Sequence, residues 1–243
     1  MNVLNTGLAC TVTVMLAGCG GQASTNPTPP PHVTSYAFVV PPLNSQRVYS
    51  ETIVDNANNT INLSYTETVT AINANGSFVV LQQDPSNNSV VANGTTYSIQ
   101  PVLITVNNSD QPLSSVNTST QVSCTDAPYG AGPTFPVTVG QSWAANYTVT
   151  CGSSPAVAYQ QSGGVVDVEP ITVPAGTFSA LKLQTTLTHT DAGGTIYNQI
   201  FATWRDAATG VVVKQQIFNT YSGTPLTNGY ALTNTIVLQS GVP

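Results

Sequence analysis

The stretch that most constrains the fold is residues 165–183, which read VVDVEPITVPAGTFSALKL. Two β-prone runs flank a break at Pro174-Ala175-Gly176, where proline fixes φ and glycine allows the positive φ of a tight turn. After the break, the alternate positions 181, 183, 185 and 187 hold Leu, Leu, Thr and Leu, a pattern that places apolar side chains mostly on one face of a strand. The stretch therefore predicts two adjacent strands joined by a tight turn.

From residue 35 onward the chain keeps this character, and no convincing amphipathic helix is found. Short β-prone runs alternate with turn signals, of which Asn93-Gly94 is the strongest hairpin signal. Residues 78–81 and 211–213 are continuous apolar runs, which suit strands covered on both faces. Residues 107–120 are polar without a period, so we predict a loop there. The predicted fold is all-β, an antiparallel curved sheet that forms an incomplete barrel or a sandwich, with residues 35–243 as a single β domain.

Composition excludes one large class of partner. Charged residues make up 6% of the chain, and Lys and Arg together number only 4. An average soluble domain has about 25% charged residues. Because no basic surface is available to neutralise phosphates, we expect no nucleic-acid partner.

Residues 1–18 read as a lipoprotein signal peptide. The apolar run at 8–17 is too short to span a bilayer and has the length of a signal-peptide core. It ends in Leu16-Ala17-Gly18-Cys19, which resembles the bacterial lipobox. That resemblance implies that the peptide is cut before Cys19 and that this cysteine is the lipidation site, acylated with palmitate. No Lys or Arg precedes residue 8, so an ordinary secretory signal with a chance cysteine is the alternative.

Residues 19–34 hold the lipidated cysteine and a linker rich in Pro, Ser and Thr, a composition that does not pack into a core. Gly20 follows the cysteine, and by analogy with enteric bacteria the absence of Asp at that position favours the outer membrane. We therefore expect a cell-envelope lipoprotein held at the outer membrane by its lipid anchor, with the periplasmic and surface faces left open.

Two cysteines remain in the mature body, Cys124 and Cys151. Cysteine pairs in an exported protein are normally oxidised. Closing a loop of this size is worth about 3.5 kcal/mol in the chain-entropy model. Without a Cys-x-x-Cys spacing or neighbouring histidines, the pair does not predict a metal site. We therefore predict a disulfide between Cys124 and Cys151.

Nucleophilic catalysis finds little support in the sequence. A Ser-His-Asp site would have to use His189, with Asp191 two residues on. The residues around Ser142 approach the nucleophile-elbow pattern, but Ala144 stands where its second glycine belongs and no helix signal follows. We interpret His189 as a surface or edge residue.

Paired carboxylates are the other catalytic candidates. Asp167 and Glu169 lie two residues apart on one strand face, and Glu51 and Glu67 are candidates to oppose each other across a hairpin. A glycosidase needs two carboxylates at a defined separation, which the sequence does not supply, and a solvated strand face explains these residues equally well. Residues 55–59 resemble a calcium loop in composition but lack its register. We expect no metal and no cofactor.

Three motifs in order carry a family resemblance. They are Phe135-Pro136-Val137 leading to Trp143, then residues 173–178 with the sequence VPAGTF, then Trp204 with residues 210–214. This series resembles proteobacterial lipoprotein and periplasmic families of unknown function that share the V-G-x-x-W and V-P-A-G-T-F motifs. The resemblance implies a curved antiparallel sheet and structural rather than catalytic roles for the motif residues, namely Trp143, Pro174, Gly176, Phe178, Trp204 and Gly210.

Together these features favour a non-enzymatic, lipid-anchored envelope module with a binding or structural role. A periplasmic carrier of a hydrophobic ligand or lipid is one alternative, and an enzyme acting on envelope polysaccharide is another. The expected partners are the membrane, through the lipid anchor, and a protein or a lipid. An apolar cavity would favour the carrier, an exposed apolar patch a protein partner, and a cleft with two facing carboxylates the enzyme.

Overall fold

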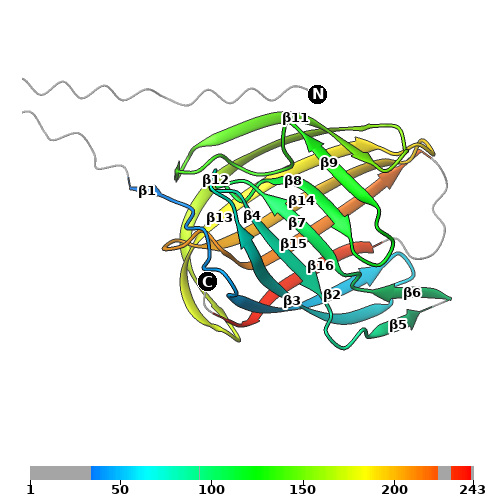
Figure 1. Cartoon of the computed structure of the whole chain (residues 1–243), viewed down its shortest axis with the longest axis horizontal. Helices are drawn as coiled ribbons and strands as arrows, with labels where there is room; N and C mark the ends of the chain where they lie inside the picture. Colours follow the sequence, from blue (N-terminus) through cyan, green and yellow to red (C-terminus); the bar gives the residue numbers. More distant parts are fainter. Residues whose placement is uncertain (1–33, 93, 224–230, 242–243) are drawn as a thin grey trace, which may run out of the picture. The chain divides into compact units, whose positions relative to one another are not determined.

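The computed structural model describes residues 34–92, 94–223 and 231–241, which belong to one compact unit, Val33–Pro243. Within these residues the regular structure is entirely strand (Figure 1). The strands are β1 (Ser35–Tyr36), β2 (Gln46–Asp55), β3 (Thr60–Ile72), β4 (Phe78–Gln83), β5 (Ser89–Ala92), β6 (Thr95–Ser98), β7 (Val102–Val106), β8 (Pro112–Asn117), β9 (Ser123–Ala127), β10 (Val137–Thr138), β11 (Ser142–Cys151), β12 (Val157–Val173), β13 (Gly176–Thr190), β14 (Ile196–Asp206), β15 (Val212–Ser222) and β16 (Ala231–Ser240).

Twelve of these strands form one closed barrel, in the order β11-β12-β13-β14-β15-β16-β2-β3-β4-β7-β8-β9. Every neighbouring pair is antiparallel, and β9 pairs with β11 to close the ring. The predicted all-β antiparallel fold is confirmed. The sheet closes completely, whereas the sequence pattern left an incomplete barrel or a sandwich open. Full closure removes the exposed edges that an open sheet would present.

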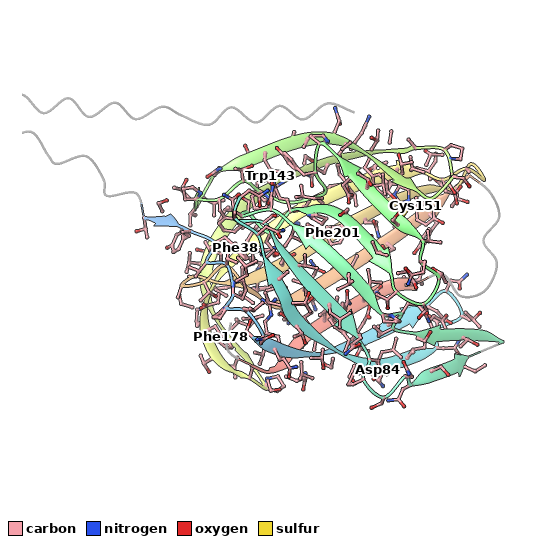
Figure 2. All side chains as sticks on the ribbon, viewed as in Figure 1. Phe38, Asp84, Trp143, Cys151, Phe178 and Phe201 are labelled. Carbon is pink, nitrogen blue, oxygen red and sulfur yellow. A yellow bond between two sulfur atoms is a disulfide. The ribbon has the colours of Figure 1, made fainter. Side chains whose placement is uncertain are left out.

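The hairpin predicted from residues 165–183 is the longest in the barrel. β12 and β13 pair from Tyr159 opposite His189 to Val173 opposite Gly176, with one register shift between Val165 and Asp167, and Gly176 has a φ of 143°. The turn curls around one end of the barrel, where Figure 2 labels Phe178. The Ala175 amide donates a hydrogen bond to a carbonyl of β16. The hairpin therefore serves as both barrel wall and end cover.

The motif residues lie at packing positions. Trp143 packs against Val165 and Leu183, and its ring lies 2.5 Å from the place where a Cβ on Gly163 would stand, so only glycine fits there. Trp204 packs in a separate cluster with Val173 and Ala180, against which Phe178 also packs. This second cluster therefore joins the tip of the β12–β13 hairpin to the barrel wall.

Gly210 lies in a tight turn between β14 and β15. Its φ is +79°, and a Cβ there would meet the Phe38 ring at 2.9 Å. Both the backbone conformation and the close approach of Phe38 therefore require glycine at this position.

The expected disulfide between Cys124 and Cys151 is present, with an S–S length of 2.04 Å. The two residues are direct partners in the β9–β11 ladder, so the bond crosses the seam at which the barrel closes.

The prediction of a loop over residues 107–120 is wrong in part, because strand β8 occupies Pro112–Asn117. All six residues of β8 are half-buried. The strand therefore shows no alternation of buried and exposed positions, and its pairing with β7 and β9 comes from tertiary context.

In the described residues there is no helix long and apolar enough to span a membrane.

Candidate ligand-binding lumen

Two ion pairs lie together inside the barrel. Arg47 on β2 contacts Glu67 on β3 at 3.2 Å, and the two are direct cross-strand partners. Arg205 on β14 contacts Asp110 at 2.8 Å. The side chains of Arg47 and Arg205 are only 8% and 12% exposed. The barrel thus encloses a network of four charges that sums to zero.

The turn between β7 and β8 places Asp110. The Asn107 side chain accepts hydrogen bonds from the backbone amides of Ser109 and Gln111, as an Asx turn does. Asp110 itself adopts a φ of 58°, a left-handed conformation that aspartate tolerates better than most residues. This geometry carries its carboxylate to Arg205 on the distant strand β14.

The first cavity, of about 210 Å³, lies against this network. One part of its wall is charged or aromatic and the other is aliphatic. Its lining residues are Arg47, Tyr49, Tyr65, Glu67, Val80, Ile104, Val106, Asp110, Pro112, Val212, Gln215 and Ile236.

Burial sets the protonation of the groups around this cavity. It raises the pKa of the Glu67 carboxyl, and the nearby Asp110 carboxylate adds to that effect, while Arg47 opposes it. Burial also raises the pKa of the Tyr49 and Tyr65 hydroxyls, so both stay neutral. The two rings stack at 5.3 Å, and the Tyr49 hydroxyl donates a hydrogen bond of 3.0 Å to the Val212 carbonyl. This wall therefore presents two neutral, stacked phenol rings.

A second cavity, of about 110 Å³, lies beside the first, and Gln215 lines both. Its other lining residues are Ala131, Gly132, Pro133, Leu183, Thr185, Phe201, Thr203 and Arg205. Figure 2 labels Phe201, which belongs to β14, near the centre of the view.

The loop at residues 128–136 covers this second cavity. The Gly132 amide donates to Gln161 Oε1 at 3.1 Å, and its carbonyl accepts from Gln111 Nε2 at 2.9 Å. The Phe135 amide donates to Ser109 Oγ at 3.1 Å. Side chains from β12 and from the turn between β7 and β8 therefore hold the loop in place.

A row of amides crosses the strands between the cavities and the far end of the barrel. Gln199 Nε2 donates to Asn219 Oδ1 at 2.8 Å, and Asn234 Nδ2 donates to Glu51 Oε1 at 2.8 Å.

The expectation that Glu51 opposes Glu67 is wrong, because Glu51 pairs with Leu63. The β2–β3 turn sets a register four residues away from the one that would bring the two glutamates together.

An aromatic ladder crosses five neighbouring strands. It comprises Tyr147, Tyr159, His189, Tyr197 and Tyr221, each opposite the next in register. The Tyr159 and His189 rings stack at 4.3 Å, and the His189 and Tyr197 rings stack at 4.4 Å. His189 is therefore a half-buried member of a stack and not a surface residue. Burial lowers its pKa, and Asp191 opposes that shift.

The residues of the serine-hydrolase pattern do not come together. Ser142 pairs with Gly164 on β12, whereas His189 pairs with Tyr159 on the same strand. Five residues of strand, roughly 16 Å, separate those two positions. Asp191 accepts hydrogen bonds from the Thr195 amide and the Tyr197 hydroxyl.

The remaining sequence candidates have structural partners. Glu169 accepts a 2.6 Å hydrogen bond from Trp204 Nε1 and pairs with Lys182 at 3.2 Å, and these contacts lower its pKa. Asp167 is exposed. Asp55 accepts hydrogen bonds from its own turn and from the Tyr97 hydroxyl. Over the described ranges no group of three or more His, Cys, Asp or Glu could hold a metal ion. Cys19 lies outside the described residues.

Comparisons with known proteins concern the fold. A Bacteroides fragilis protein, described as exported and of YmcC-like fold, aligns with a TM-score of 0.50 and 12% identity over 86% of this chain and 100% of that one. A protein from Parabacteroides distasonis that is described as a lipoprotein aligns with a TM-score of 0.48 and 12% identity, over 86% of this chain and 100% of that one. YmcC from Escherichia coli, also described as a lipoprotein, aligns with a TM-score of 0.41 and 13% identity, over 84% of this chain and 90% of that one. No family model and no curated protein matches the sequence. The chain therefore has a fold similar to that of the Bacteroides fragilis protein.

No sequence pattern predicted the charge network. Arg47 and Arg205 are two of only 4 basic residues in the chain, and each stands within a β-prone run. That scarcity was the available signal, because a cation placed on a strand of a closed barrel needs an acidic partner when it points inward.

Proposed function

We propose that this chain is a lipid-anchored cell-envelope protein whose barrel is a non-enzymatic module that binds a small ligand in its lumen. The first cavity carries the proposal, because ion-paired, aromatic and aliphatic side chains from several barrel strands border it. A mostly apolar pocket with a few convergent polar groups is the usual form of a small-molecule site.

Fold stability alone is a poor explanation for the charges in the lumen. The chain has 4 basic and 10 acidic residues, and two of each lie in this network. Removing charges from water is costly, and apolar side chains of similar volume stabilise a core at least as well as a buried ion pair does. A ligand that needs charged partners gives these residues a reason to be there.

The size and lining of the cavity favour a small ligand over a lipid. Its volume of about 210 Å³ lies below the roughly 300–1,000 Å³ of pockets for drug-sized molecules. Aliphatic residues such as Ile104 and Ile236 form only part of the wall, and Arg47 and Glu67 form another. A hydrophobic carrier would need a larger and more uniformly apolar space.

The enzyme alternative has one supporting observation, because Glu67 and Asp110 line the same cavity. Each carboxylate, however, is bound to an arginine. A general acid and base pair needs one carboxyl free to protonate the leaving group and the other free to activate water or to attack. The ion pairs therefore favour binding over catalysis.

Exposed apolar residues give weaker support to a protein partner. Ile200 and Phe218 are direct cross-strand partners, 45% and 48% exposed. Two side chains make a small patch, well below the size that marks an interface. The lumen remains the better candidate for a binding site.

The membrane anchor rests on the lipobox-like residues 16–19, ending in Cys19. We expect radiolabelled palmitate to enter the wild-type protein in bacterial cells and to be absent from Cys19→Ala. Equal labelling of both proteins, or labelling of neither, would remove the lipid anchor from the proposal.

The binding role is tested by releasing the ligand. The mature protein is purified from the cells that naturally make it, denatured, and the released small molecules are identified by mass spectrometry. Ile236→Phe fills the first cavity, and Ile200→Phe makes the same change at an exposed position. We expect a stoichiometric compound from wild type and Ile200→Phe and its loss from Ile236→Phe. No compound from wild type, or the same amount from all three, would contradict the proposal.

A further inference from the structure

Arg205 uses only one end of its guanidinium group within the protein. Nη1 donates to Asp110 Oδ2 and to the Gly210 carbonyl, both at 2.8 Å. Nε is buried and has no hydrogen-bond partner. Nη2 makes no hydrogen bond within the described ranges. A buried cationic donor without a partner is costly, so an acceptor is expected beside it.

The free edge of Arg205 has a specific geometry. Nε–H and one N–H of Nη2 point in the same direction and form a planar fork. Two oxygens on one carbon match that fork, because both N–H groups can donate in parallel. The unpaired edge is therefore the part of the arginine best suited to bind a carboxylate.

Arg205 lines the second cavity, and the other lining groups complete the site. Gln215 Nε2 donates to Thr203 Oγ1 at 3.0 Å, which leaves the Thr203 hydroxyl proton available to an oxygen in the cavity. Thr185 brings a second hydroxyl, and Leu183 and Phe201 bring apolar surface. The site thus combines hydrogen-bond donors with a short apolar wall.

We propose that the second cavity binds the carboxylate of a small aliphatic acid, with its two oxygens on Nε and Nη2 of Arg205 and its chain against Leu183 and Phe201. This inference rests on the proposed binding function and names its ligand class. Because Gln215 borders both cavities, a longer acid extends past it toward the aliphatic side of the first cavity.

Phosphate fits this site less well than a carboxylate does. A phosphate group has more oxygens and more charge to satisfy, and the donors here are one fork and two hydroxyls. Asp110 and Glu67 also lie in the same charge network, and they would repel a dianion more strongly than a monoanion.

Equilibrium dialysis of isotope-labelled butyrate against the mature protein, freed of its own ligand, tests the proposal. We expect saturable binding of one butyrate per chain. Butyramide, which has the same shape without the charge, should not compete, and inorganic phosphate should compete weakly. Competition by phosphate as strong as that by unlabelled butyrate would overturn the assignment to a carboxylate.

Arg205→Lys keeps the charge and a partner for Asp110 but removes the fork. We expect butyrate to bind this variant at least roughly tenfold more weakly, the factor that corresponds to losing one charge-assisted hydrogen bond. Lys182→Gln is the matched control, since Lys182 contacts Glu169 and Trp204 and lines neither cavity. Equal affinity in wild type and Arg205→Lys would refute the proposal.

Thr203→Val keeps Arg205 intact and gives a second test if Arg205→Lys does not fold. It removes the hydroxyl donor with little change in volume, so we expect weaker butyrate binding and an unchanged fold by near-ultraviolet circular dichroism. Unchanged binding to Thr203→Val would contradict the site. A stoichiometric native compound together with no butyrate binding would reject the carboxylate assignment alone, and the absence of both would reject the lumen as a binding site.

Discussion

The charge network and the aromatic ladder both cross the inner wall of one barrel, yet they differ in what they leave unfilled. Each ladder ring from Tyr147 to Tyr221 faces its register partner, and no ladder residue lines either cavity. The charged side chains, in contrast, border both cavities. On β14, eight residues, roughly 26 Å, separate Tyr197 of the ladder from Arg205 of the network.

This difference separates structural from functional use of the same wall. Direct cross-strand aromatic pairs stabilise a sheet and fill space. Buried ion pairs add little net stability, and here they stand beside unfilled space. We therefore expect substitutions in the ladder to change stability but not binding, and conservative substitutions in the network to change binding.

The largest expected effect comes from the seam beside the ladder. Replacing both cysteines, Cys124→Ser with Cys151→Ser, frees a loop with a sequence separation of 27. We expect a loss of about 3.5 kcal/mol in the free energy of unfolding, measured in urea. Butyrate affinity should be unchanged in the folded protein. A comparable loss of affinity would show that the seam and the lumen are not independent.

The next effect tests whether the Arg47–Glu67 ion pair adds net stability. Arg47→Met leaves Glu67 without its partner and should lower the free energy of unfolding by about 3 kcal/mol. Arg47→Met with Glu67→Leu removes both charges and should recover most of that loss. Urea denaturation of the two variants gives the comparison. If the double variant were as unstable as the single one, the pair would be a structural element after all.

A smaller effect is expected in the ladder. His189→Ala removes two stacked contacts, each worth about 0.5–1.5 kcal/mol, so the free energy of unfolding should fall by about 2 kcal/mol. The ladder lines neither cavity, so butyrate affinity should stay at the wild-type value. A variant of wild-type stability with weakened binding would reverse the roles given to the two regions.

The smallest effect is a pH dependence from Glu67. Burial raises its pKa above the ordinary value of 4.5, so the folded state binds the proton more tightly than the unfolded state does. Its contribution should therefore favour the folded state at low pH and be lost as pH rises from 4.5 through the raised pKa. Glu67→Gln cannot titrate, so its unfolding free energy should lack this contribution. The same pH dependence in both proteins would assign the effect to another group.

Local signals predicted much of the fold from the sequence. The break at residues 174–176 indicated the β12–β13 hairpin, and the scarcity of cysteine indicated the Cys124–Cys151 pair. Strand β8 was missed because its half-buried residues follow no alternating pattern. Closure of the barrel was also beyond local pattern, since β9 and β11 pair across an intervening segment whose strand β10 pairs with β1 outside the barrel sheet.

The candidate site was hidden for a different reason. Asp110 and Arg205 are 95 residues apart, and their contact depends on a left-handed residue in one turn and on the register of distant strands. The ladder is likewise spread over five strands, so His189 looks isolated in the sequence. Arg47, rather than Glu51, faces Glu67 because the turn after β2 fixes the register.

The most direct test of the lumen as a binding site is a crystal structure of the mature protein isolated from its own membranes. We expect ordered, non-water density in the first cavity against Arg47 and Tyr49, continuing past Gln215 to the Nε edge of Arg205. Cavities that hold only separate water molecules in protein never exposed to denaturant, with Arg205 bonded to water alone, would contradict it.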